Sequence, residues 1–213
     1  MGLLSLLTTH PLVFVVLLSI FLLTLSVHEA SHALAGLLLG DPTAQRMHRL
    51  TLNPFAHIDP IGLIALITIG FGWGKPVPFN PYNLRWRRWG PVLVAAAGPF
   101  ANLVVGAIAS IIYGRLSLVL ESTNLLLLVL QYTAALNFIL LIFNLIPIPP
   151  LDGSKALIAV FTQLRYARAA AFLETQGPFL LILLVILDMF TAVGVFAWMS
   201  DAAQLLFRFF AGG

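Results

Sequence analysis

The sequence predicts an all-α integral membrane protein, and three observations lead to this fold class. First, 60% of the 213 residues are hydrophobic and only 9% are charged, whereas a soluble domain carries about 25% charged residues. Second, four apolar runs reach the length of about 20 residues that a spanning helix needs. Third, prolines and polar stretches separate these runs. We therefore expect about four main transmembrane helices, a re-entrant or β-hairpin element and a possible C-terminal helix.

The main spans follow in order along the chain, and their expected bounds are about 11–39, 91–113, 124–146 and 178–198. A cluster of prolines after residue 146 ends the third span, because proline lacks the backbone donor and clashes with the preceding turn. Residues 202–210 are expected to form a terminal helix or an interfacial tail. The sequence has no repeat and no interdomain linker, so we expect residues 1–213 to form a single multi-pass domain.

A shorter apolar run lies between the first two spans. Ile61–Gly72 is too short for an ordinary spanning helix, and glycine, proline and β-branched residues continue to Phe79. We expect a re-entrant element over about 61–79, with short strands. The free edge of such a strand could pair with an extended peptide.

The charge pattern and the cysteine count exclude several classes of function. The net charge of +3 does not indicate nucleic-acid binding, because the basic residues cluster beside apolar segments, where they fit membrane topology. The absence of cysteine excludes disulfides, iron–sulfur clusters and thiol catalysis. The N-terminus has neither a basic n-region nor a small-residue cleavage site, so we expect the first apolar run to be retained.

The basic residues predict the topology in the cell membrane. Two groups lie between spans one and two and between spans three and four: Arg46, Arg49, Lys75, Arg85, Arg87 and Arg88, then Lys155, Arg165 and Arg168. The positive-inside rule places both groups in the cytoplasm and both termini outside. Trp73, Trp86 and Trp89 lie where an inner interfacial belt is expected.

The most informative motif is His28-Glu29-Ala30-Ser31-His32, which lies inside the first apolar run. Each charged group at the centre of a spanning helix costs about 2.5–3.5 kcal/mol on insertion scales, so these side chains indicate function. His28 and His32 share one helix face and can hold one metal ion. H-E-x-x-H is the metalloprotease signature, in which the glutamate activates water. We expect one Zn²⁺ per chain, in the cytoplasmic half of the membrane.

The third metal ligand must come from another segment. Asp152 is the best choice, because it follows an apolar helix and a proline-rich turn and returns to the same side of the membrane as His32. His57, near the re-entrant segment, is the alternative ligand. A structural polar cluster without metal is the competing interpretation of the motif.

Several motifs, in this order, resemble the site-2 protease family of intramembrane zinc metalloproteases: HEASH, NPFAHIDPIG, GWGKPVPFNP, AAGPFANL and NLIPIPPLDG. The resemblance is to the compact bacterial and archaeal members, without a PDZ or nucleotide-sensing domain. It implies cleavage within or near transmembrane segments of membrane-tethered proteins. It also implies that His28, His32 and Asp152 bind zinc and that Glu29 is the general base.

Three further polar residues are candidates for the site. Asn144 could bind the substrate backbone or the oxyanion, or only satisfy the end of its helix. Asn102, in Gly98-x-x-x-Asn102-x-x-x-Gly106, could contact substrate or oxyanion, hydrogen-bond to the catalytic helix or line a water cavity, although close helix packing alone also explains this spacing. His57 could form a gate or support the site, or only stabilise a turn.

The function expected from the sequence is therefore an intramembrane zinc metalloprotease. Two other classes remain open: a zinc-binding scaffold that captures helices without cutting them, and a metal transporter. A transporter would usually show internal repeats, and the sequence has none. The expected partners are a transmembrane substrate and membrane lipid, with no nucleic acid; the sequence leaves a monomer and a small homo-oligomer equally open.

Overall fold

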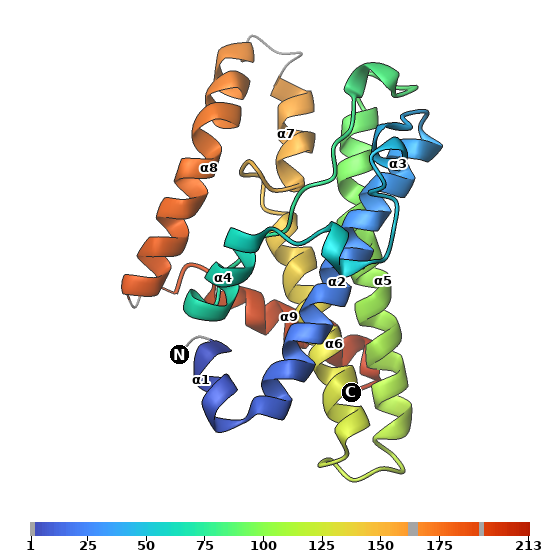
Figure 1. Ribbon diagram of the computed structural model, residues 1–213, viewed down its shortest axis with the longest axis vertical. Coiled ribbons are helices and arrows are strands. Elements are labelled where there is room, and N and C mark those ends of the chain that lie inside the picture. The colour runs from blue at the N-terminus through green and yellow to red at the C-terminus, as the bar shows by residue number, and fades with distance from the viewer. Residues whose placement is uncertain (1–2, 162–165, 192–193) are drawn as a thin grey trace.

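The computed structural model describes residues 3–161, 166–191 and 194–213, and every regular element in these ranges is a helix. Four helices are long and apolar enough to span a membrane: α2 (Pro11–Leu38), α5 (Gly90–Leu116), α6 (Leu125–Asn144) and α8 (Ala167–Phe190). In Figure 1 α2, α5 and α6 cross one another, α8 stands at the opposite edge, and the short α7 (Gly153–Phe161) lies between α8 and α5. The all-α membrane fold predicted from the sequence is confirmed.

The helices α2, α5 and α6 pack closely because their facing side chains are small or mutually bonded. A Cβ added at Gly106 of α5 would lie 2.7 Å from the ring of Phe138 in α6, which is fully buried. Asn137, the residue before Phe138 in α6, donates a hydrogen bond to the Thr24 hydroxyl of α2 at 3.0 Å. These contacts fix the position of α2, which carries the HEASH motif.

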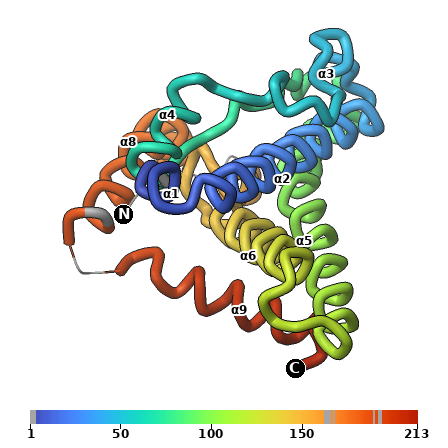
Figure 2. The backbone as a smooth tube through the Cα atoms, turned by 60° about the horizontal axis from the view of Figure 1, so that its bottom comes forward, coloured from blue at the N-terminus to red at the C-terminus, as the bar shows by residue number. Residues whose placement is uncertain are grey.

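The C-terminal helix α9 (Ala197–Ala211) covers the far side of α6. Ala203 belongs to one buried cluster with Ala109 of α5 and with Ala134 and Phe138 of α6. Figure 2 shows α6 between α2 and α9. The predicted C-terminal helix is present, and it begins earlier than residue 202.

The bounds predicted for the fourth span are wrong. The helix α8 begins at Ala167 and ends at Phe190, whereas the sequence predicts about 178–198. Pro178 suggested a helix start, since proline fits a first turn, but α8 runs through it and gives up only the hydrogen bond of that residue. The helix stops at Thr191, which is extended. Residues 192–193 of the predicted span, and Arg165, lie outside the described residues.

The segment predicted to be re-entrant contains a helix, so the short strands and the β-hairpin predicted there are wrong. Residues Pro60–Ile69 form α4, and the only pairing in the described ranges is an isolated bridge between Ile58 and Gly74. The Asp59 carboxylate caps the first turn by accepting from the amides of Ile61 and Gly62 at 2.9 Å. A helix also satisfies its own backbone groups, which apolar surroundings require.

The connection from α6 to α7 returns the chain to α2. A Cβ added at Gly153 would lie 2.3 Å from the carbonyl oxygen of Leu145, so the turn closes on itself where only glycine fits. This turn contains the proline cluster predicted to end the third span. It places Asp152 beside the HEASH helix.

Candidate metal centre

The two HEASH imidazoles lie side by side on the buried half of α2. Their Nε2 atoms are 3.0 Å apart, and the two residues are 4% and 8% exposed. The polar residues of α2 are concentrated in this second half, where α5 and α6 cover the helix. The i, i+4 spacing gives both rings the same direction.

Asp152 completes a triangle with the two imidazoles. Its Oδ2 lies 3.3 Å from the Nε2 atoms of both His28 and His32. Tetrahedral ligands with bonds of about 2.0–2.1 Å to zinc stand about 3.3–3.4 Å from one another. The separations of the three donor atoms, 3.0 Å and 3.3 Å, are therefore close to those of three corners of a zinc tetrahedron.

The hydrogen bonds around the two rings fit a metal better than a purely structural cluster. The Nδ1 of His28 faces the Asn102 amide oxygen at 3.0 Å, and the Nδ1 of His32 faces the Val94 carbonyl oxygen at 2.7 Å. Both oxygens only accept, so each Nδ1 donates and each Nε2 keeps a lone pair directed at its neighbours. Asp152 Oδ2, which is buried without a hydrogen-bond partner among the described residues, then needs a cation.

Gly98 of α5 forms the floor under these rings. A Cβ at this position would come within 2.4 Å of the Nε2 of His32 and 2.7 Å of the Cε1 of His28. The space that a methyl group would occupy is therefore filled by the imidazole edges. Two nitrogens and one carboxylate oxygen are a donor set that zinc accepts, so the residues present fit the ion.

Glu29 points to a different partner from the adjacent histidine. Its Oε2 accepts a hydrogen bond from the backbone amide of Val77 at 3.0 Å, and the residue is 8% exposed. Val77 lies in residues 73–80, an extended segment that we call the strap. Pro76 and Pro78 have no N–H, so Val77 is the one backbone donor between them.

The strap is fixed on both sides of Val77. The amide of Lys75 donates to the His57 carbonyl oxygen at 2.8 Å, and Arg49 donates to the Lys75 carbonyl oxygen. Beyond Val77, the amide of Asn80 donates to the Asp41 carboxylate at 2.6 Å. The strap therefore holds Glu29 from a position that both flanking loops define.

Asp41 is a buried anion at the end of α2. Burial raises the pKa of its carboxyl, but hydrogen bonds from the side chains of Thr43 and Asn83 and from the amides of Asn80 and Thr43 outweigh it and hold the pKa below the usual value. The lowered pKa shows that these bonds favour the charged form. This anion ties the strap to the HEASH helix.

Two other predicted site residues, His57 and Asn144, have hydrogen-bond partners outside the donor triangle. His57 is fully buried; its Nε2 faces the Thr51 carbonyl oxygen at 2.9 Å and its Nδ1 faces Arg49. It is not in the group with His28, His32 and Asp152. The amide of Asn144 donates to the Leu140 carbonyl oxygen at 3.0 Å.

Asn102 occupies a different position from a substrate or oxyanion ligand. It is fully buried and binds the far side of the His28 ring, so the geometry points to orientation of that imidazole. The spacing from Gly98 to Asn102 was a usable signal for this interhelical contact. Val94 and Val77 were missed, because they act through backbone groups that no residue type reveals.

Comparisons with known proteins agree with this geometry. The family described as Peptidase family M50 matches residues 117–187. "Putative zinc metalloprotease YwhC" of Bacillus subtilis is 38% identical over 63% of this chain and 64% of its own length. "Putative zinc metalloprotease Rip2" of Mycolicibacterium smegmatis is 33% identical over 70% of this chain and 60% of its own length.

A relative from Mycobacterium tuberculosis covers nearly the whole chain. It bears the same name, "Putative zinc metalloprotease Rip2", and is 30% identical over 97% of this chain and 82% of its own length. The chain thus spans less than two thirds of the first two relatives and more than two thirds of the third. No solved structure matches the chain significantly.

Proposed function

Since the chain belongs to peptidase family M50, the site-2 proteases, we propose that it is an intramembrane zinc metalloprotease. It hydrolyses peptide bonds within or near transmembrane segments of membrane-tethered proteins. The observation that carries this proposal is the triangle of His28, His32 and Asp152, with Glu29 beside it, in a chain with four helices able to span a membrane.

The chemistry divides between the ion and the side chains. His28, His32 and Asp152 would hold the zinc ion, which would supply Lewis acidity that polarises a carbonyl and makes water acidic enough to lose a proton near neutral pH. Glu29 takes this proton on its carboxylate and passes it to the leaving amine. The Val77 amide keeps the carboxylate oriented before substrate arrives. Asn102 and Val94 hold the imidazole rings in the tautomer that leaves both Nε2 atoms free.

An apolar cavity at the end of α6 supports a membrane-embedded substrate. It has a volume of about 550 Å³ and lies between the end of α6, α8 and the start of α9, lined by residues such as Leu145, Leu184 and Phe196. Its walls fit an apolar segment better than a soluble peptide. Asn144 stands at the same end of α6, and its amide oxygen, which has no donor among the described residues, is suited to bind an unwound substrate backbone.

The orientation in the membrane follows from the basic residues. We assign the end of the bundle that carries Arg85, Arg87 and Arg88 to the cytoplasm, and both termini to the outer side. The centre then lies in the cytoplasmic half, and water reaches it from that side. We call this end of the bundle the basic end.

The test compares Glu29→Gln with wild-type protein, both loaded with zinc and reconstituted with single-span substrates. We expect Glu29→Gln to keep one zinc per chain, because glutamine also accepts from Val77, and to cut about 10²–10⁴-fold more slowly. Glu121→Gln, the same change in the exposed loop after α5, should cut like the wild type.

Three outcomes distinguish the remaining interpretations. Full cleavage by zinc-loaded Glu29→Gln would remove Glu29 from the chemistry. Loss of zinc in that variant would make Glu29 a ligand. Zinc-loaded wild-type protein that binds helices without producing new termini would be a capture scaffold.

A further inference from the structure

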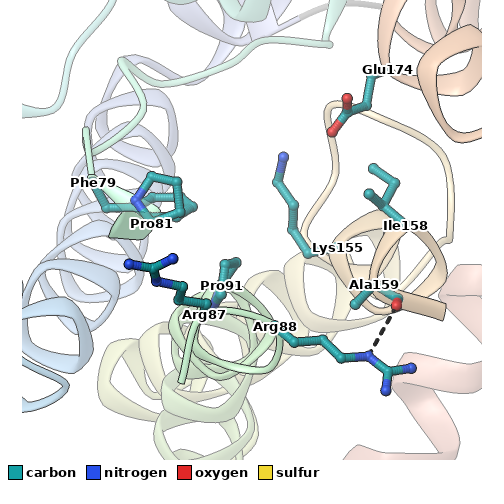
Figure 3. A pocket seen from close by; sticks show the side chains of 9 residues that line it. All are labelled: Phe79, Pro81, Arg87, Arg88, Pro91, Lys155, Ile158, Ala159 and Glu174. Carbon is teal, nitrogen blue, oxygen red and sulfur yellow. Dashed lines mark hydrogen bonds between the residues drawn. The ribbon is translucent and has the colours of Figure 1, made fainter. Parts of the chain in front are cut away.

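A second cavity lies at the basic end of the molecule. Its volume is about 510 Å³, and its walls come from the end of the strap, the start of α5, α7 and α8 (Figure 3). Phe79, Pro91 and Ile158 give it an apolar surface. We call it the basic cavity, because its charged side chains are mostly cationic.

The charges of the basic cavity are not neutralised internally. Arg87, Arg88 and Lys155 face it together with one carboxylate, Glu174. Arg88 is already held: its Nε donates to the Ala159 carbonyl oxygen at 3.3 Å, and its guanidinium stacks on Trp89 at 4.8 Å. In the described part of the chain, neither Arg87 nor Lys155 has a side-chain hydrogen bond or an ion pair. These two cations are available to an anion.

The cavity adjoins the metal centre through two segments. Phe79 lies two positions after Val77, whose amide binds Glu29, so an extended chain covers the interval in about 7 Å. Lys155 lies one helical turn after Asp152, or about 5 Å along α7. A peptide whose scissile bond lies at the centre can therefore reach the cavity with its next few residues.

We propose that the basic cavity binds acidic side chains of the substrate, just outside its transmembrane segment at the basic end. This inference rests on the proposed function and names a substrate class: membrane segments with Asp or Glu at that flank. Carboxylates pair with guanidinium and ammonium groups through short, charge-assisted hydrogen bonds. The apolar surface accommodates the methylene groups of the same side chains.

This specificity selects a minority of membrane segments. Cytoplasmic flanks of spanning helices are enriched in Lys and Arg, which the cavity repels. A substrate with acidic residues there is distinguished by charge from most helices in the same bilayer. A phospholipid phosphate is a weaker fit, because the cavity is built by the strap and α7, the two segments that lead to the metal centre.

The experiment measures KM for two single-span peptides that differ only in the flank at the basic end, Glu-Glu against Gln-Gln. Both are tested in pure phosphatidylcholine vesicles and again with phosphatidylglycerol. We expect a KM about tenfold lower for the Glu-Glu peptide, in both vesicle types. Arg87→Glu and Lys155→Glu should lose this preference, and Arg85→Glu, an exposed change in the same loop outside the cavity, should keep it.

A binding arm separates failure of this inference from failure of the proposed function. Peptide affinity is measured with Glu29→Gln, alone and combined with each of the charge reversals Arg87→Glu and Lys155→Glu. Cleavage without any flank preference overturns the inference and leaves the protease intact. Flank-dependent binding without cleavage keeps the inference and overturns the protease. A flank preference that neither Arg87→Glu nor Lys155→Glu changes also overturns the inference. If these variants weaken binding of all peptides equally, and only in vesicles with phosphatidylglycerol, the inference is overturned in favour of a lipid phosphate.

Discussion

His57 and the pair His28 and His32 are all buried, yet their ring nitrogens have different surroundings. Both nitrogens of His57 face protein partners, the Thr51 carbonyl oxygen and Arg49. In the pair, the Nδ1 atoms face an amide oxygen and a backbone carbonyl oxygen, while the Nε2 atoms face each other and a shared carboxylate oxygen. Exposure alone would not separate a structural histidine from a ligand, whereas the partners of each nitrogen do.

The same comparison explains why one histidine stabilises a loop while the other two are candidate metal ligands. The Nε2 hydrogen bond of His57 ends at the carbonyl of Thr51, and the His57 carbonyl accepts from Lys75, so it connects the loop before α4 to the strap. The Nε2 atoms of the pair face Asp152 Oδ2 at 3.3 Å, and this oxygen is buried without a hydrogen-bond partner in the described part of the chain. A buried carboxylate oxygen with this surrounding fits a cation-binding site.

The largest expected effect comes from removing the carboxylate of the triangle. Asp152→Ala should weaken zinc binding by more than about 100-fold, since even outer partners of metal ligands contribute about 10–100-fold. His57→Gln should retain wild-type zinc affinity, because it lies outside the triangle. Chelator competition measures both. Zinc loss in His57→Gln with retention in Asp152→Ala would reverse our assignment.

Two glycines of α5 provide a steric test of the same distinction. Gly98→Ala places a methyl group 2.4 Å from the Nε2 of His32, so we expect zinc affinity to fall at least about tenfold. Gly106→Ala instead meets Phe138 at 2.7 Å and should lower stability by about 1–3 kcal/mol with zinc affinity unchanged. Equal zinc affinity in both variants would show that the floor under the rings is not tight.

Two buried asparagines offer a milder comparison. Asn102→Ala removes the acceptor for His28 Nδ1, and we expect a loss of about 10–100-fold in zinc affinity, with partial recovery in Asn102→Asp. Asn137→Ala removes a bond to Thr24 and should reduce thermal stability alone. If Asn102→Ala bound zinc like wild type, the asparagine would have only a packing role.

The smallest effect concerns Asp41, which, like His57, has its hydrogen-bond partners within the protein. Its pKa is lowered in the folded state, so its contribution to stability is present above the unfolded value of about 3.9 and is lost as pH falls through the folded pKa. Asp41→Asn should have a lower melting temperature than the wild type at neutral pH, and its melting temperature should fall less steeply as the pH is lowered into the acid range. Identical acid limbs for the two proteins would contradict this role.

The sequence predicted those parts of the site that depend on residue type and period. HEASH placed two rings on one helix face, and the return of the chain after the third span placed Asp152 near them. The strands predicted for residues 61–79 were wrong because β-branched residues also suit a short apolar helix, once Asp59 caps it. The bounds of α8 were wrong because Pro178 was taken as a start, although a long helix tolerates one missing bond.

The contact between Glu29 and the strap lay beyond sequence reasoning for another reason. A backbone amide is present at almost every position, so Val77 carries no mark of its role. Only the path of the strap, set by Asn80 and Lys75 at its two sides, brings this amide to the carboxylate. Contacts between segments 48 positions apart depend on the whole fold.

That backbone contact has a consequence for mutational tolerance. An alanine scan of the strap would leave the hydrogen bond to Glu29 intact, because alanine at position 77 still supplies an N–H. Many different side chains at position 77 would therefore keep the contact with Glu29. Proline alone deletes the donor, and Val77→Pro would create three consecutive prolines from Pro76 to Pro78. The orientation of Glu29 therefore requires only that position 77 is not proline, because nearly every other residue there supplies the same amide.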